Sequence, residues 1–211
     1  MSRGRLIISN IIGVVVILAI VAGGAYFYYQ NQTYLKTDEA HVAGDMMQIA
    51  TPAAGKITQW NVKEGDAVKA DQEIGKISDG KTETPIKATK AGTIVKNSVN
   101  QDQMVQAGQV LAQTIDMNNL YVTANIKEND IKDIENGDKV DITVDGDSKT
   151  TFEGNIDEIG YATTSVFSLM PQQNTSGNYT KVTQKVPVKI SIKNPSDKVL
   201  PGMNAEISIT K

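Results

Sequence analysis

Apolar and polar positions divide the chain into one uninterrupted apolar segment and a long stretch of short alternating runs. Residues 6–29 contain no charged residue and are mostly Ile, Val, Leu, Ala and Gly. A helix of ~20 such residues crosses the ~30 Å hydrocarbon core of a bilayer. After residue 29, apolar residues alternate with polar ones in runs that end at Gly, Asp, Asn or Pro, as in strands and turns. The pattern predicts an all-β ectodomain on one N-terminal transmembrane helix.

The residues that flank the apolar segment predict its orientation. Arg3 and Arg5 precede it, with no acidic residue before it, so the positive-inside rule places residues 1–5 in the cytoplasm and the rest of the chain outside the cell membrane. Three aromatic residues stand where an interfacial belt belongs: Tyr26, Phe27 and Tyr28. A cleaved signal peptide is the alternative. Its apolar core runs ~7–15 residues, so the length of residues 6–29 favours a retained single-pass anchor.

A motif in residues 55–74 recurs without a gap in residues 92–111. Each copy predicts a strand, a tight turn and a second strand. The positions that define the repeat are Gly55, Val62, Gly65 and Val68 in the first copy and Gly92, Val99, Val105 and Gly108 in the second. Because so short a repeat cannot bury its apolar face alone, the two copies are predicted to pack face to face as a small sandwich over residues 51–116.

Two further regions flank this sandwich. Residues 30–50 are predicted as a linker and a leading strand. After residue 116 the pattern predicts a small antiparallel β-barrel over residues 117–211. Its predicted strands are residues 120–126, 139–144, 151–159, 183–192 and 205–210. Residues 128–135 are predicted as a short helix closed by Asn136 and Gly137.

The order of these parts resembles a known family. The anchor is followed by the run Thr-Asp-Glu-Ala-His-Val at residues 37–42, the split repeat, and a barrel that ends in Leu-Pro-Gly-Met at residues 200–203. This order resembles the HlyD-type membrane fusion proteins, also called periplasmic adaptor proteins. Residues 167–190 closely resemble the EmrA branch, whose partners are drug/proton antiporters of the major facilitator superfamily.

The resemblance implies a split lipoyl/biotinyl-like sandwich and a β-barrel. It also implies a non-enzymatic adaptor subunit of a multidrug efflux system, with no cofactor, docked on the outer face of an integral-membrane transporter. An adaptor of an ABC exporter is the alternative within transport, and homo-oligomerisation is left open.

One feature departs from many family members, in which a long helical hairpin separates the lipoyl halves. Here only residues 78–84 are available. Seven residues span ~25 Å at full stretch, and so few residues cannot supply two packed helices. The sequence therefore predicts a short form without the hairpin, which fits a bacterium with a single membrane.

Residues 163–178 predict a contact with the transporter. The segment is long and polar for so compact a domain, yet it carries apolar residues, which favours either a partner surface or a plug packed on the barrel. The candidate contact residues are Phe167, Leu169, Met170, Pro171, Asn174, Asn178 and Tyr179.

Lys81 raises a hypothesis from a different class. Biotinyl and lipoyl domains carry a modified lysine between their two halves, so the chain could be a membrane-tethered carrier that uses Lys81. The Met-Lys-Met signature of biotin acceptors is missing, and the predicted topology separates Lys81 from cytoplasmic ligases. An ordinary solvated turn lysine is therefore favoured.

The composition argues against several other functional classes. Beyond the two N-terminal arginines, 19 basic residues face 24 acidic ones with no basic stripe, which argues against nucleic-acid binding. The chain has no cysteine and a single histidine, His41, so neither a Cys/His metal site nor a serine triad can be assembled. Four acidic residues lack the spacing of a calcium loop: Asp141, Asp145, Asp147 and Glu153. Trp60 is predicted to fill the seam of the sandwich.

Overall fold

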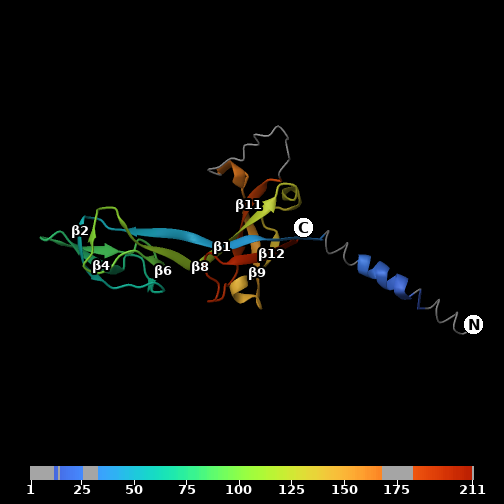
Figure 1. Ribbon diagram of the computed structural model, residues 1–211, viewed down its shortest axis with the longest axis horizontal. Coiled ribbons are helices and arrows are strands. Elements are labelled where there is room, and N and C mark those ends of the chain that lie inside the picture. Colours follow the sequence, from blue (N-terminus) through green and yellow to red (C-terminus); the bar gives the residue numbers. More distant parts are fainter. Residues whose placement is uncertain (1–11, 14, 26–32, 168–182, 211) are drawn as a thin grey trace, which may run out of the picture.

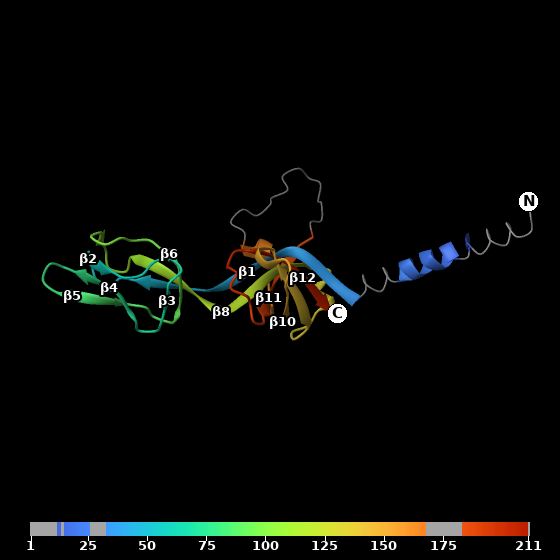
Figure 2. The same cartoon turned by 90° about the horizontal axis from the view of Figure 1, so that it is seen from below.

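The computed structural model describes residues 12–13, 15–25, 33–167 and 183–210. Residues 12–13 and 15–25 are helical and lie apart from the β-strands (Figures 1 and 2). Within the described residues, no helix has both the length and the apolar character needed to cross a membrane. The predicted anchor residues lie outside the described residues: Arg3, Arg5, Tyr26, Phe27 and Tyr28.

The described residues otherwise form an all-β fold, as the sequence predicts. Its strands are β1 (Tyr34–Ala50), β2 (Gly55–Trp60), β3 (Ala67–Val68), β4 (Glu73–Ser78), β5 (Glu83–Lys87), β6 (Gly92–Asn97), β7 (Met104–Val105), β8 (Val110–Lys127), β9 (Lys139–Val144), β10 (Thr151–Ile159), β11 (Lys185–Ile192) and β12 (Asn204–Thr210). Three short 3₁₀ helices lie between strands: η1 (Ile131–Asp133), η2 (Asp145–Asp147) and η3 (Thr164–Phe167).

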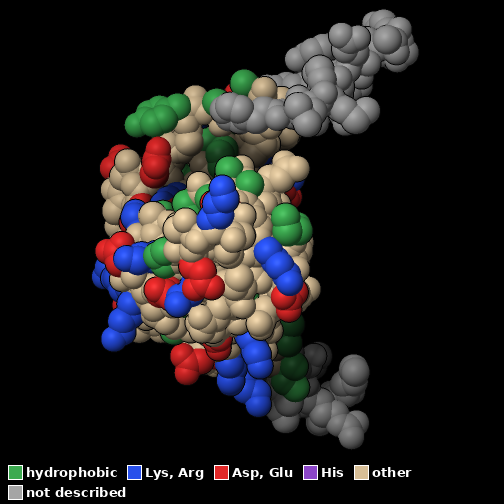
Figure 3. Space-filling view, turned by 90° about the vertical axis from the view of Figure 1, so that its left-hand side faces the viewer, with side chains coloured by type: hydrophobic (Ala, Val, Ile, Leu, Met, Phe, Trp, Pro, Cys, Tyr) green, Lys and Arg blue, Asp and Glu red, His purple; other side chains and the backbone are tan. Residues whose placement is uncertain are grey.

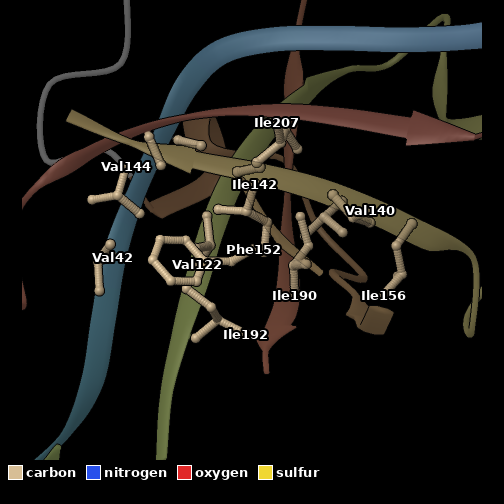
Figure 4. Packing of buried hydrophobic residues seen from close by; sticks show 14 of the residues in the cluster. Val42, Val122, Val140, Ile142, Val144, Phe152, Ile156, Ile190, Ile192 and Ile207 are labelled. Atoms are coloured by element: carbon tan, nitrogen blue, oxygen red, sulfur yellow. The ribbon is translucent and has the colours of Figure 1, made fainter. Parts of the chain in front are cut away.

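The predicted barrel is confirmed. Its strands follow the order β1-β12-β9-β10-β11-β8, and pairing of β8 with β1 closes it. Alternate side chains of these strands point inward, as the period-2 pattern requires. Figure 4 shows how they converge on one core, whose members include Val122, Ile142, Phe152, Ile190 and Ile207.

Strands β1 and β8 run on from the barrel into the sandwich. In the barrel they pair from Ala40–Ala124 to Gly44–Leu120, and in the sandwich from Met46–Ile115 to Ala50–Val110. The predicted leading strand in residues 30–50 is thus β1, which is shared by both bodies, and the predicted boundary at residue 116 falls inside β8. Between the two ladders, Asp45 alone faces residues 116–119, so β8 bulges there. We call this junction between the barrel and the sandwich the neck.

The two copies of the repeat interlock rather than only packing face to face. Strand β2 of the first copy pairs with β7 of the second, and β6 of the second pairs with β3 of the first. Matching backbone bonds cross in both directions: the Gly65 N–H donates to the Ile94 carbonyl and the Asp102 N–H to the Ile57 carbonyl, each at 2.8 Å. Neither copy can satisfy its backbone alone, which is why the motif occurs twice.

The turns of the two copies repeat the same backbone conformation. A left-handed residue stands at Gly65 (φ 93°) in the first copy and at the equivalent Asp102 (φ 70°) in the second. A second such pair is Asp71 (φ 61°) and Gly108 (φ 78°). Glycine and aspartate both tolerate this region, so the sequence identity of the turns is lost while their geometry is kept.

The predicted helix over residues 128–135 is wrong, because the structure forms only the single turn η1 there. The N-cap residue Asp130 makes no side-chain capping bond, and Ile134 leaves the turn in an extended conformation to enter the barrel core. One turn of helix does not recover the cost of nucleation, whereas burying Ile134 gives the segment an apolar contact.

Candidate docking site

The turn at the tip of the sandwich is short and closed. Residues 79–82 join β4 to β5, and Asp79 Oδ1 accepts hydrogen bonds from the backbone N–H groups of Thr82 and Lys81, each at 2.8 Å. These bonds, first from Thr82 and then from Lys81, hold the pKa of Asp79 below its ordinary value. The connection between the lipoyl halves is thus a capped hairpin turn, and the chain is a short form without the helical hairpin.

The sandwich end carries Lys81 as an exposed turn residue. Figure 3 looks onto this end and shows charges of both signs scattered over a largely neutral surface. Within the described part of the chain, no group of three His, Cys, Asp or Glu side chains could hold a metal ion. The turn at residues 79–82 therefore presents polar side chains, and the exposed apolar side chain of Met104 stands on β7 of the same sheet.

A different surface lies at the end of the barrel where β10 finishes and β11 begins. Tyr161 is 98% exposed and Val166 is 69% exposed, whereas apolar side chains of the barrel core are almost fully buried. The backbone beneath them is fixed, because the Gly160 N–H donates to the Pro187 carbonyl at 2.8 Å. Because these exposed apolar side chains lie next to the segment predicted as a partner contact, this barrel end is the candidate docking surface.

Both ends of this loop are fastened to the barrel. The Thr164 hydroxyl donates to the Lys185 carbonyl at 3.4 Å, and the Glu128 N–H donates to the Gln184 carbonyl at 2.9 Å. The Lys185 ammonium also pairs with Glu39 of β1, so that its side chain passes over β8. Both side chains are partly exposed, and such pairs contribute at most ~1 kcal/mol, so this ion pair orients the loop more than it stabilises the fold.

The predicted contact residues have one member in the described chain. Phe167 is the last residue of η3. The other six lie outside the described residues: Leu169, Met170, Pro171, Asn174, Asn178 and Tyr179. The structure adds Tyr161 to the candidate surface and shows that Val166, which lies within the predicted segment 163–178, is exposed. Tyr161 could have been found from the sequence, because it follows Gly160, just past the end of β10. Beyond the strand, the alternating pattern no longer turns side chains toward the core.

The other residues singled out by the sequence lie either in the sandwich core or in contacts that hold the fold together. The repeat valines Val62, Val68, Val99 and Val105 all lie in the sandwich core, as does most of Trp60, whose ring lies against Gly75. His41 is an exposed residue of β1. Asp147 is only 8% exposed: it accepts a bond from the Ser196 hydroxyl at 2.9 Å and pairs with Lys198 at 3.5 Å. The Ser196 bond, more than Lys198, holds the pKa of Asp147 below its ordinary value.

An interlocked lipoyl-like sandwich joined by two long strands to a six-stranded barrel defines a membrane fusion protein. Two family profiles match the chain: the YhbJ barrel-sandwich hybrid domain over residues 45–116 and the YknX-like beta-barrel domain over residues 120–209. The putative efflux system component YhbJ of Bacillus subtilis is 63% identical over 211 residues, which cover all of this chain and 95% of that protein. The chain belongs to the HlyD-type membrane fusion proteins, in the EmrA-like branch.

Further similarity is found to a more distant relative and to two solved structures. The colistin resistance protein EmrA of Acinetobacter baumannii is 35% identical over 121 residues, 56% of this chain but only 34% of that protein. Among solved structures, ZneB of Cupriavidus metallidurans has a TM-score of 0.65 and the periplasmic adaptor protein EmrA one of 0.58. Each is 13% identical and spans 85% of this chain and 99% of the solved one, which shows a shared fold.

Proposed function

We propose that this chain is the membrane-anchored adaptor subunit of a multidrug efflux system and docks on the outer face of an integral-membrane transporter. The observation that carries the proposal is its 63% identity, along the whole chain, to a protein named as an efflux system component. Relatives named as multidrug resistance proteins, EmrK and MdtN of Escherichia coli, support the same assignment. The adaptor performs no chemistry and needs no cofactor; the transporter supplies the energy.

The proposed partner is a drug/proton antiporter of the major facilitator type. Support comes from residues 167–190, which resemble the EmrA branch, and from the identity to EmrA itself. The contact uses the barrel end that carries Tyr161 and Val166, since these large apolar side chains are exposed beside the same loop. The capped turn at residues 79–82 offers no comparable surface.

The proposed location is the cell membrane of a bacterium with a single membrane. Residues 6–29 form the anchor, with residues 1–5 in the cytoplasm and both β-bodies outside. The uncharged segment and the two preceding arginines support this topology. Without a hairpin between its halves, the adaptor ends close to the membrane and releases exported compounds at the outer face.

Affinity purification of the full chain from its own cells in mild detergent tests the partner. We expect a major facilitator transporter to co-purify in stoichiometric amount. Recovery of an ATP-hydrolysing exporter instead would assign the chain to the ABC class. Intact mass of the same sample tests the carrier alternative, because a cofactor on Lys81 would add its mass and Lys81→Arg would remove it. Recovery of no transporter under cross-linking would contradict the adaptor role.

A further inference from the structure

A cleft of about 670 Å³ lies at the neck between the sandwich and the barrel. Its floor is the bulge of β8, at Met117 and Asn118. Thr93 of β6 stands on the sandwich side, and the loop between β11 and β12 stands on the barrel side with Asn194 and Asp197. The volume falls within the ~300–1,000 Å³ typical of small-molecule sites, and the site lies between domains, where such sites are common.

The cleft lining combines apolar and neutral polar groups with one charge. Met117, Pro195 and Val199 give it an apolar part, and Val199 is almost fully buried. None of the residues that line it, all within the described chain, is Lys or Arg. Asp197 is the only charged residue of the lining, and it has no ion-pair partner among the described residues.

The neighbouring cation is held elsewhere. Lys198 follows Asp197 directly, and its ammonium pairs with Asp147 of η2 at 3.5 Å. Ser196 donates to the same carboxylate, so residues 196 and 198 both fasten the loop to η2. Asp197 lies between these two attachments, so the loop that carries it is anchored on both sides. Asp197 itself is exposed and makes no ion pair with another described residue.

We infer that the cleft binds an amphipathic cation, with its apolar body against Met117, Pro195 and Val199 and its positive charge beside Asp197. A carboxylate in a partly apolar cleft whose lining contains no Lys or Arg attracts cations and repels anions. Because the walls belong to different bodies, a bound cation also bridges the sandwich and the barrel across the two-stranded neck. This site goes beyond the proposed docking role and does not depend on the identity of the transporter.

A pair of ions with one shape and opposite charge tests the inference. Tetraphenylphosphonium and tetraphenylborate are titrated calorimetrically into the full-length protein in a neutral detergent. We expect the cation to bind and the anion not to bind. Asp197→Asn should weaken the cation at least fivefold, and Asp197→Lys should make the anion the preferred ion. The matched control Asp157→Asn, an exposed charge on β10, should change neither titration more than twofold. Partitioning into detergent is the same for all variants.

The absence of native cysteine allows the site to be located directly. Asn118→Cys should react with a maleimide more slowly when tetraphenylphosphonium is present, whereas Ser148→Cys, outside the cleft, should react at an unchanged rate. Equal affinity of the wild type and Asp197→Asn for the cation would overturn the inference, as would Asn118→Cys labelling that the cation does not slow. Both measurements use the isolated chain, so a failure to find the transporter would leave them unaffected.

Discussion

The turn at the sandwich tip and the end of the barrel differ in the side chains that they expose: polar ones at the tip turn and large apolar ones at the barrel end. At the tip, Asp79 accepts the backbone donors of residues 81 and 82, and no large apolar side chain stands in residues 79–82. At the barrel end, the backbone of Gly160 is equally well bonded, yet Tyr161 and Val166 stand in water. An exposed apolar side chain on a fixed backbone gives the fold little and gives a partner a large contact. The comparison supports the proposal that the barrel end is the docking surface.

The largest expected effect tests whether both ends lie on one side of the membrane. Lys81→Cys at the tip and Ser148→Cys in the barrel should both react with an impermeant thiol reagent on intact cells. Ser2→Cys should react only after the cells are permeabilised. The cysteine-free background makes each signal unambiguous. Labelling of Ser2→Cys alone on intact cells would reverse the proposed orientation.

The next effect tests whether the sandwich is one interlocked unit. Val62, Val68, Val99 and Val105 share one core. Replacing any of them with Ala should lower the free energy of unfolding by ~1–3 kcal/mol, through lost apolar burial and a residual cavity. Equivalent positions in the two copies should cost similar amounts in chemical denaturation.

Met104→Ala is the matched control, because this β7 side chain is 71% exposed. Its denaturation midpoint should equal that of the wild type. Midpoints that stay unchanged in all four valine variants would show that the interlocked core does not hold the sandwich together.

A smaller effect tests whether the barrel carboxylate Asp147 stabilises the fold. The Ser196 hydroxyl lowers the pKa of Asp147 in the folded state. Such a group stabilises the fold above its unfolded pKa of about 3.9, and this contribution is lost as pH falls through the lower folded pKa. Denaturation midpoints of Asp147→Asn should therefore depend less on pH below about pH 4 than those of the wild type.

Variants of two residues near Asp147 serve as a supporting test and as a control. Ser196→Ala should move the behaviour of the wild type toward that of Asp147→Asn, since it removes the main bond to the carboxylate. Asp145→Asn, an exposed neighbour in η2, serves as the charge control and should keep the wild-type dependence. If the denaturation midpoints of Asp147→Asn and the wild type depend on pH in the same way, the Asp147 carboxylate does not stabilise the fold.

Much of the fold follows from local pattern. Strands β9 and β10 match their predicted bounds because their apolar residues alternate without interruption and the flanking turns contain Gly, Asp or Asn. The repeat also locates the sandwich core, since Val62 and Val99 occupy equivalent buried places. Period and turn chemistry are local properties, so they can be read without knowing the partners of a strand.

Other features depend on partners that lie far away in the chain. Strands β3 and β7 contain two residues each, too few to show alternation, and exist only because the other copy pairs with them. The continuity of β1 through the neck depends on the bulge of β8, which no local signal in β1 announces. For the docking site, sequence indicated the loop after β10, but the exposure of Tyr161 follows from where the barrel ends.

We propose that the barrel end, rather than the sandwich tip, binds the transporter, and one double variant distinguishes the two ends. Tyr161→Ser with Val166→Ser is compared with Lys81→Ser for thermal unfolding and for co-purification with the transporter. Both variants should melt like the wild type, because surface substitutions change stability by roughly 0.5 kcal/mol or less. We expect at least tenfold less transporter to be recovered with the barrel variant and an unchanged amount with Lys81→Ser. Full recovery with a normally melting barrel variant would contradict the proposal.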